Sequence, residues 1–238
     1  MSIDGDPFIR QRVLGGMGDR GQATLSKARV AIVGVGGLGC PAALYLAAAG
    51  VGQLTLIDSD AVTVSNLHRQ ILFSPQDVGR RKVDAAADAL GRLCPWTTVV
   101  THDQRLTQQD AALVAGHDVV LDCTDTWPSR EDVAALAHQA GITVVWGAVY
   151  TWFGQVTVFD NQHRLADVFP EPPAPELAVC DGGGVLGPLC GQVATAMASQ
   201  AIVALTGTGR GLRGRLSVID ARDGGWRTVT IAGREGTP

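Results

Sequence analysis

Basic residues are few in this 238-residue chain, where 19 lysines and arginines stand against 23 aspartates and glutamates, for a formal net charge of -4. A domain that binds nucleic acid usually carries a strong basic excess, so nucleic acid is not an expected partner. Cysteine is also sparse: the five residues at positions 40, 94, 123, 180 and 190 form no Cys-x-x-Cys pair. An odd count without pairs argues against a disulfide framework and favours a reducing, cytoplasmic compartment.

Apolar segments of the kind that address a chain to a membrane do not stand out. The first residues, MSIDGDPFIRQR, contain no apolar run, and we expect no signal peptide. A membrane span needs about 18 apolar residues without charge, and we expect none here. Hydrophobic residues make up 46% of the chain, which is enough for the core of one compact domain.

Short β-rich runs alternate with longer helical ones over the first 148 residues. This alternation predicts a Rossmann-like α/β fold, with a mostly parallel sheet and helices on both faces. The expected strands are 29–33, 53–57, 97–101, 118–121 and 142–148. The expected helices are 38–49, 79–93, 107–115 and 129–139, after a helical arm over 7–25.

The pattern changes after residue 148. A strand over 155–159 follows its predecessor too closely for a parallel crossover, so the sheet is expected to continue as an antiparallel C-terminal half. Residues 160–185 are irregular and rich in proline and glycine, which is typical of a functional loop. The remaining expected elements are a small-residue helix over 189–205 and an antiparallel strand pair over 216–219 and 228–231.

A glycine-rich turn lies between the first strand and the first long helix, and reads Gly34-Val35-Gly36-Gly37-Leu38-Gly39. Glycines at such a turn let the backbone approach a phosphate or sugar, and the helix N-terminus adds amide donors. Asp58 ends the next strand, where a carboxylate accepts hydrogen bonds from ribose hydroxyls. The motif predicts a nucleotide site without separating a dinucleotide from ATP; a tight turn with no ligand is the structural alternative.

Two basic residues favour a triphosphate. Arg69 follows Asn66 and precedes Gln70, and Lys82 falls in the first turn of a predicted helix. Arginine offers a planar fork of donors and lysine a compact charge, and both suit phosphate oxygens. A cation at a helix N-terminus is poorly placed in the helix dipole, which favours a functional role for Lys82. The alternative is a solvated basic face.

The fourth expected strand ends in Asp122-Cys123-Thr124-Asp125. Ligands of open α/β sheets lie at the carboxyl ends of the strands. Asp125, just past the strand, suits a hydrated Mg²⁺ that also touches phosphate oxygens. We interpret Asp122 as a structural acceptor for the turn, and the alternative for Asp125 is an ordinary residue at a helix N-terminus.

Together these residues resemble the MoeB/ThiF/HesA family of ubiquitin-activating-enzyme-like adenylyltransferases. The resemblance covers about residues 8 to 220 and rests on Arg10-Gln11, the glycine turn, Asp58-x-Asp60, Asn66-x-x-Arg69-Gln70, Gly79-x-x-Lys82, Asp122-Cys123-Thr124-Asp125, Cys180 and Gly184-Val185-x-Gly187-Pro188. It implies ATP-dependent adenylation of the C-terminal glycine carboxylate of a small ubiquitin-like sulfur-carrier protein ending in Gly-Gly, with Mg²⁺ and release of pyrophosphate. A sulfurtransferase or cysteine desulfurase would then supply sulfur.

The resemblance also implies which residues act. The expected catalytic set is Arg10, Arg69, Lys82, Asp125 and Cys180, with Asp125 holding Mg²⁺. The expected nucleotide-binding set is Gly34, Gly36, Gly37, Gly39, Asp58, Asp60, Asn66, Arg69, Gln70, Lys82 and Asp125. Family members are typically homodimers in which the arm arginine, here Arg10, reaches the neighbour's phosphates.

The resemblance predicts one adenylyltransferase domain over 1–238. An arm (1–25) would precede a nucleotide-binding half (26–148) and a carrier-binding half (149–238), with a loop at about 160–185 crossing the active site. Many members hold structural zinc with two Cys-x-x-Cys pairs, which this chain lacks. We therefore expect no zinc, and a mobile loop around 162–178.

Two questions stay open on the sequence. Cys180 is either a loop residue or a nucleophile that accepts the carrier or its sulfur after adenylation. The adenylated carboxylate could also belong to a peptide, a small molecule or a tRNA-bound amino acid, and the chain could be a non-catalytic partner subunit or, by fold alone, an NAD-dependent dehydrogenase. The carrier's pathway, whether thiamine, molybdopterin, tRNA thiolation or a secondary metabolite, is undetermined.

Overall fold

A computed structural model describes residues 5–172 and 184–231 of the chain. The strands are β1 (Arg29–Val33), β2 (Gln53–Ile57), β3 (Thr98–His102), β4 (Val119–Asp122), β5 (Thr143–Tyr150), β6 (Phe153–Phe159), β7 (Arg215–Asp220) and β8 (Gly225–Thr230). The α-helices are α1 (Ile9–Arg12), α2 (Gly18–Leu25), α3 (Gly39–Ala48), α4 (Lys82–Leu93), α5 (Ala111–Val114), α6 (Trp127–Ala140), α7 (Leu165–Val168) and α9 (Gly187–Thr206). Two 3₁₀ turns, η1 (Val64–Asn66) and η2 (Pro75–Asp77), lie between β2 and α4.

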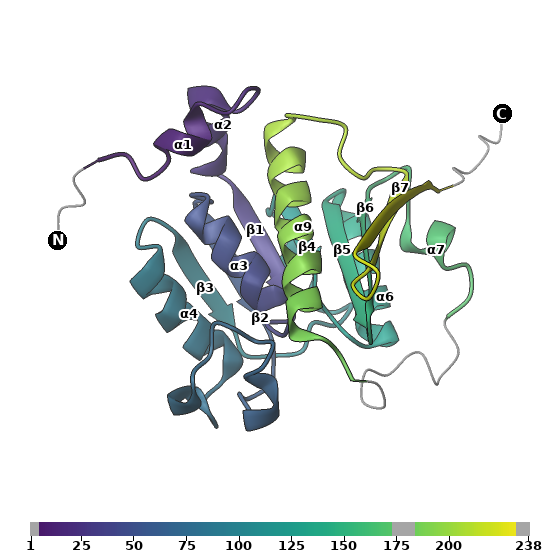
Figure 1. Cartoon of the computed structure of the whole chain (residues 1–238), viewed down its shortest axis with the longest axis horizontal. Coiled ribbons are helices and arrows are strands. Elements are labelled where there is room, and N and C mark those ends of the chain that lie inside the picture. Colours follow the sequence, from purple (N-terminus) through teal and green to yellow (C-terminus); the bar gives the residue numbers. More distant parts are fainter. Residues whose placement is uncertain (1–4, 173–183, 232–238) are drawn as a thin grey trace.

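All eight strands form one sheet in the order β3-β2-β1-β4-β5-β6-β7-β8 (Figure 1). Strands β1 to β5 pair in parallel, and β5 to β8 pair antiparallel. Only two residues separate β5 from β6, too few for a parallel crossover, which explains the change of direction. The predicted fold class is therefore confirmed, including the antiparallel second half.

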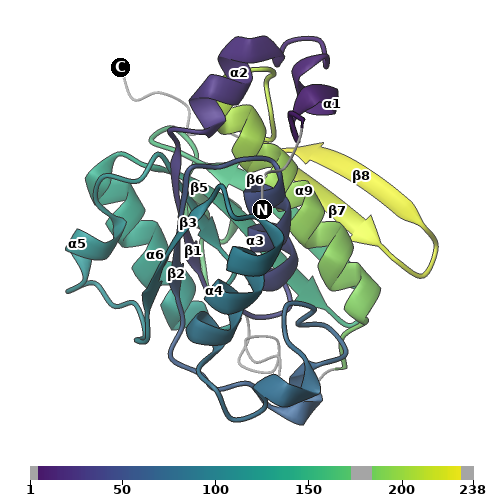
Figure 2. The same cartoon turned by 90° about the vertical axis from the view of Figure 1, so that its left-hand side faces the viewer.

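Helices cover both faces of the sheet, as the two views show (Figure 2). Side chains alternate between faces along each strand, so β1, β2, β4 and β5 each contribute residues to two cores. Val30, Ile32, Leu54 and Leu121 belong to the core under α2, α3, α4 and α9. The core under α5, α6 and α7 takes the alternate positions, among them Ala31, Val33, Val120 and Trp146. Burial on both sides explains why these strands are continuous apolar runs.

The strand order reverses direction between β1 and β4, because β2 and β3 continue on one side of β1 while β4 and β5 lie on the other. Such a switch point leaves a crevice beyond the carboxyl ends of the strands. The glycine turn after β1, Asp58 after β2 and the turn at the end of β4 all meet there. The topology thus gathers three of the sequence motifs at one edge of the sheet.

Several expected element boundaries were wrong. The helix expected from residue 79 begins at Lys82, because Gly79 has a φ of 88° and Lys82 N donates to Asp60 O. The helix expected over 107–115 shrinks to α5, because Asp110 caps Thr107 in a turn. The arm is two helices separated by residues 13–17 rather than one, and α7 is a short helix inside a stretch expected to be irregular.

Helix α9 bears on the expectation that the chain has no membrane span. Its 20 residues carry no charge, and by length and composition alone it could cross a membrane, the one such helix in the described residues. Its apolar character has a different use here, since Leu189, Val193 and Met197 are buried against the sheet and α3. Gly147 and Gly154 leave room for it: a Cβ on either would collide with Met197 or Val193. Close packing on the sheet accounts for the small residues of this helix.

His117 is a buried polar residue of this framework. Its Nδ1 lies 3.0 Å from Val114 O, which only accepts, so Nδ1 donates, and Nε2 lies 2.8 Å from Thr55 Oγ1. Burial lowers the pKa of His117 and favours the neutral ring, in which Nε2 accepts from the hydroxyl. The unfolded chain therefore takes up a proton below about pH 6.5 that the folded chain does not bind.

We predict that His117 lowers the free energy of unfolding as the pH falls below about 6.5, because the unfolded state binds its proton at a higher pH than the folded state does. One proton sets an upper limit of about 1.4 kcal/mol per pH unit for the slope. Urea unfolding between pH 5 and 7.5 measures it. Replacement His117→Gln should remove this component, whereas His138→Gln, on an exposed position of α6, should leave it. An unchanged pH dependence in His117→Gln would refute the assignment.

Candidate functional site

A cavity of about 730 Å³ lies beyond the carboxyl ends of β1, β2 and β4. Nine of the eleven residues expected to bind nucleotide line it: Gly34, Gly36, Gly37, Asp58, Asp60, Arg69, Gln70, Lys82 and Asp125. Gly39 and Asn66 are not in its lining, and neither is Arg10, which lies on the exposed face of α1. Residues separated by up to 91 positions along the chain thus meet around one space.

The glycine turn forms the floor of the cavity, and its glycines differ in function. Gly34 has a φ of 91°, and a Cβ on it would lie 2.8 Å from Cys123 O. A Cβ on Gly39 would collide with Gly34 O, closer than real Cβ atoms approach, so Gly39 serves the packing of the turn rather than a ligand. Gly36 is different, because its Cβ would meet only the Gln70 amide, at 3.7 Å. The backbone at Gly36 is therefore the part open to a ligand.

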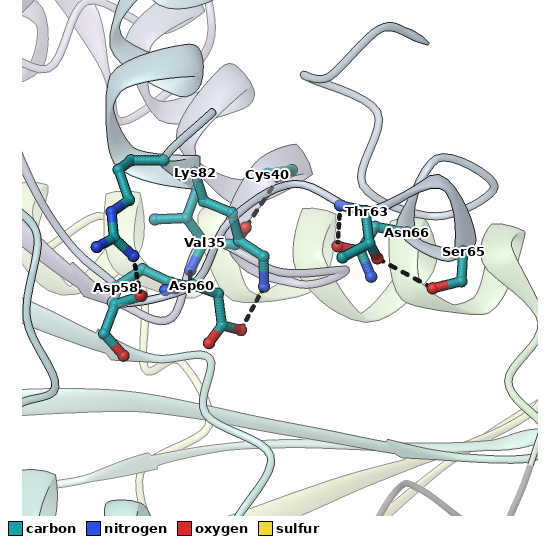
Figure 3. Close-up of polar contacts among 10 residues, drawn as sticks. Val35, Cys40, Asp58, Asp60, Thr63, Ser65, Asn66 and Lys82 are labelled. Carbon is teal, nitrogen blue, oxygen red and sulfur yellow. Dashed lines mark hydrogen bonds and ion pairs between the residues drawn. The ribbon is translucent and has the colours of Figure 1, made fainter. Parts of the chain in front are cut away.

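Asp58 joins the glycine turn to the end of β2. Its Oδ2 accepts from Val35 N at 2.7 Å and its Oδ1 accepts from Asp60 N at 2.8 Å (Figure 3). Burial raises the pKa of Asp58, while the charge of Lys82 and the two backbone hydrogen bonds act in the opposite direction. The carboxylate thus fixes the turn while it lines the cavity, the position expected of a ribose acceptor.

Lys82 places a buried cation in the wall of the cavity. Its side chain is 7% exposed, and Nζ lies 2.6 Å from Oδ2 of Asp60, whose side chain is 65% exposed (Figure 3). Asp60 O also accepts from Lys82 N at 3.0 Å, so one residue fixes both ends of Lys82. A buried ammonium needs a partner, and an exposed carboxylate is one that anionic groups of a ligand can replace.

The segment after η1 supplies a second cation. Arg69 Nη1 donates to Ser65 O at 3.0 Å and lies 2.8 Å from His68 Nε2, so neutral acceptors rather than a carboxylate hold it. Gln70 is buried, and its Oε1 has no hydrogen-bond partner among the described residues. Asn66 caps η1, because its Oδ1 accepts from Thr63 N at 3.2 Å, and its contact with a nucleotide stays a prediction.

The turn after β4 completes the wall. Asp122 is buried, and its Oδ1 accepts from Thr124 N at 3.0 Å and from Thr124 Oγ1 at 2.7 Å, which confirms its interpretation as a structural acceptor. Burial raises the pKa of Asp122, and the charge of Arg130 acts against this rise. Asp125 is exposed in the cavity lining.

The lining includes residues that the sequence motifs did not mark. Among them are His68, Gln104, Arg105, Arg130, Tyr150 and Thr151. Arg130 lies on α6 without a motif around it, and Tyr150 and Thr151 lie where β5 turns into β6. No local signal marks such residues, because only the folded sheet brings them to the cavity.

Four of the five cysteines lie within the described residues. Cys40, Cys94, Cys123 and Cys190 are buried. Burial raises the pKa of Cys40 to about 12 and that of Cys123 well above its usual range, so these thiols are poor nucleophiles. Cys180 lies outside the described residues, and its two interpretations stay open.

The lining fits a nucleoside triphosphate with a divalent cation. It combines an open glycine backbone, a buried lysine with a replaceable partner and an orphaned Gln70 acceptor. Within residues 5–172 and 184–231, no group of three or more His, Cys, Asp or Glu residues could by itself hold a metal. Mg²⁺ is usually bound by one or two carboxylates plus substrate phosphates, and Asp125 suits that arrangement. The expectation that the chain holds no zinc stays a prediction.

Comparison with known proteins gives the site a family context. A profile of the ThiF family matches residues 8–237. The chain is 41% identical to the probable adenylyltransferase/sulfurtransferase MoeZ of Mycobacterium tuberculosis, over 97% of its own length but only 61% of the MoeZ chain. It is 38% identical to the sulfur carrier protein adenylyltransferase of Thermus thermophilus, over 95% of this chain and 87% of that protein.

A solved structure of Escherichia coli MccB has the same fold. It superposes with a TM-score of 0.84 over 98% of this chain and 71% of MccB, at 18% identity. At that identity the likeness concerns the fold alone, and it agrees with a Rossmann-like sheet that continues antiparallel.

We predict that Gly39→Ala destabilises the protein by about 2–3 kcal/mol, because its Cβ would collide with Gly34 O and overpacking has this magnitude. The melting temperature without nucleotide should fall by about 5–10 °C. Gly36→Ala is the matched control, since its Cβ meets only the Gln70 amide. Equal melting temperatures for the two variants, measured by circular dichroism, would contradict the distinction between the glycines.

Proposed function

The chain belongs to the ThiF family, and we propose that it uses ATP and Mg²⁺ to adenylate the C-terminal glycine carboxylate of a small ubiquitin-like sulfur-carrier protein. The observation that carries this proposal is the meeting of Gly36, Arg69, Lys82 and Asp125 around one cavity at the switch point of the sheet. The names of the relatives, an adenylyltransferase/sulfurtransferase and a sulfur carrier protein adenylyltransferase, support the same reaction.

In this mechanism a carboxylate oxygen of the carrier attacks the α-phosphorus of ATP, an acyl-adenylate forms and pyrophosphate leaves. Two anions must approach each other, so the site has to supply fixed positive charge at the developing phosphoryl charge. Arg69 and Lys82 provide it from two walls of the cavity. Asp125 would hold Mg²⁺, which neutralises charge on the phosphate oxygens when bound.

The remaining residues orient the nucleotide. The open backbone at Gly36 and the N-terminus of α3 face the phosphates, and Asp58 accepts from ribose hydroxyls while it fixes the glycine turn. Asp60 acts through Lys82: it holds the ammonium in place before the triphosphate arrives. The triphosphate then replaces the carboxylate as the partner of the buried cation.

The antiparallel half offers a surface for the carrier. Tyr150, Trp152 and Phe153 are 39–46% exposed at the turn between β5 and β6, and Tyr150 also lines the cavity. Trp226 and Val229 are exposed on β8. Exposed apolar patches of this kind mark protein interaction sites. A carrier docked here would have its tail next to the cavity, and its pathway and the sulfurtransferase or cysteine desulfurase that follows depend on its identity.

We also propose a homodimer in which Arg10 acts on the neighbour's phosphates. Within its own chain Arg10 does not line the cavity. Its helix and the segment after it expose Ile9, Val13 and Leu14 by 53–72%, an apolar surface that a second copy would cover. This arrangement would complete each site with a cation from its partner.

Removal of charge from the cavity should abolish adenylation without unfolding the chain. We predict that Lys82→Met and Asp125→Asn each lower carrier-dependent ATP–pyrophosphate exchange about 100-fold or more. Lys82→Met removes positive charge at the developing phosphoryl anion, and Asp125→Asn removes the carboxylate that would hold Mg²⁺ there. Arg92→Met, an exposed position of α4, is the control for loss of an arginine or lysine elsewhere. Near-normal exchange in either cavity variant would remove that residue from the mechanism.

Action of Arg10 in trans can be tested by complementation. Arg10→Ala and Lys82→Met chains should each be inactive as homodimers. A mixed dimer should regain pyrophosphate exchange at one of its two sites, because that site combines an intact Lys82 with an intact partner Arg10. Subunit exchange is verified with differently tagged chains. No recovery in verified mixed dimers would show that Arg10 acts within its own chain, and an active Arg10→Ala homodimer would show that Arg10 has no role in the reaction.

A further inference from the structure

The turn after β4 is fixed at a single residue, Thr124, through all three of its polar groups. Its N–H and its hydroxyl both donate to Asp122 Oδ1, at 3.0 and 2.7 Å. Its carbonyl accepts from Arg130 Nη2 at 3.2 Å. The N–H and the carbonyl of Thr124 are therefore held by two different elements, β4 and α6. The orientation of the next residue, Asp125, depends on both contacts.

Arg130 is itself held in place from behind. Its Cζ lies 5.0 Å from the ring centroid of Trp146, within the range of a cation–π interaction. Trp146 is buried in β5, and the register pairs it with Asp122 across the strands. The ring centroid of Phe169 lies a further 5.4 Å from that of Trp146. The guanidinium thus lies between an aromatic ring and the Thr124 carbonyl, with its charge close to Asp122.

The position of this turn matters for both walls of the cavity. Asp125 follows Thr124 directly and lines the cavity. On the other side Cys123 O faces the site where a Cβ of Gly34 would be, so the same turn presses against the glycine turn. A shift of a few tenths of an ångström at Thr124 would therefore move the carboxylate at the rim and loosen the floor.

We propose that Arg130 is a positioning residue, which orients the turn after β4 through the Thr124 carbonyl so that the Asp125 carboxylate is presented to the metal–phosphate complex. This inference rests on the proposed function for the identity of that complex. Residues that hold a metal ligand from outside typically contribute 10–100-fold to metal affinity. Arg130 also lines the cavity, so the competing assignment is a direct contact between its guanidinium and a phosphate.

The two assignments differ in what happens without metal. A positioning residue changes metal affinity and leaves the affinity for metal-free nucleotide alone, whereas a phosphate ligand changes both. We would measure Mn²⁺ binding by electron paramagnetic resonance in the presence of a non-hydrolysable ATP analogue. Binding of the analogue in EDTA is measured by calorimetry. The full chain is used, as wild type, Arg130→Met, Arg130→Lys and Trp146→Phe, with Arg92→Met as the matched control.

Arg130→Met should bind Mn²⁺ about 10–100-fold more weakly, with the affinity for metal-free analogue within twofold of wild type. Arg130→Lys should lie in between, because it retains the charge without the planar fork. Trp146→Phe keeps a ring and should weaken Mn²⁺ binding less than Arg130→Met. Thermal unfolding sets a temperature at which all variants are folded, and a purely structural role would lower the melting temperature without a selective loss of metal affinity.

Two results would overturn the inference: wild-type Mn²⁺ affinity in Arg130→Met, or an equal loss of affinity for the metal-free analogue, which would assign Arg130 to a phosphate. Amide hydrogen exchange of residues 122–126 in the nucleotide-free protein gives an independent readout, and it should be faster in Arg130→Met but not in Arg92→Met. If the wild-type chain binds neither analogue nor Mn²⁺, the proposed function fails. The amide hydrogen exchange rates of residues 122–126 then decide alone. Unchanged amide exchange in Arg130→Met refutes the positioning role.

Discussion

The site depends on the close approach of the backbone at Gly34 to the end of β4. Gly34 N donates to Ile57 O while its α-carbon faces Cys123 O at a distance that leaves no room for a Cβ. The chain leaving β1 is therefore held between its two neighbouring strands. From that point it can turn directly into α3, and Val35 N reaches Asp58. The floor of the cavity, the ribose acceptor and the turn that carries Asp125 take their relative positions from this one contact.

The two cations of the cavity, Lys82 and Arg69, are held by partners that leave them able to bind an anionic ligand. Lys82 is buried and needs a partner, and the carboxylate that it contacts is largely in water, where the anionic groups of a ligand can replace it. Arg69 is held by a carbonyl and an imidazole. Both arrangements leave the positive charge able to bind a ligand. In a salt bridge between two fully buried partners, each charge would instead be needed by the other.

The sequence predicts the parts of this structure that local chemistry determines. The limits of β1 and β2 follow from continuous apolar runs, and the parallel order puts Gly36, Asp58 and Asp125 at one edge. A motif records position but not direction, so it does not show that the Asn66 side chain caps η1 through its Oδ1. Arg130 escaped notice because its partners, Thr124 and Trp146, reach it only through the register of β4 against β5.

That register also explains how the two halves of the chain belong together. Trp146 pairs in parallel with Asp122 on one side and antiparallel with Thr157 on the other, so it lies on the strand where the sheet changes direction. Its ring packs against Phe159 and Phe169, which come from the second half. One of the two hydrophobic cores thus contains residues from both halves, and the single domain over 1–238 stays a prediction. Arg130 contacts the same Trp146 ring and donates to Thr124 O. A rearrangement around Phe169 would therefore shift the turn that presents Asp125.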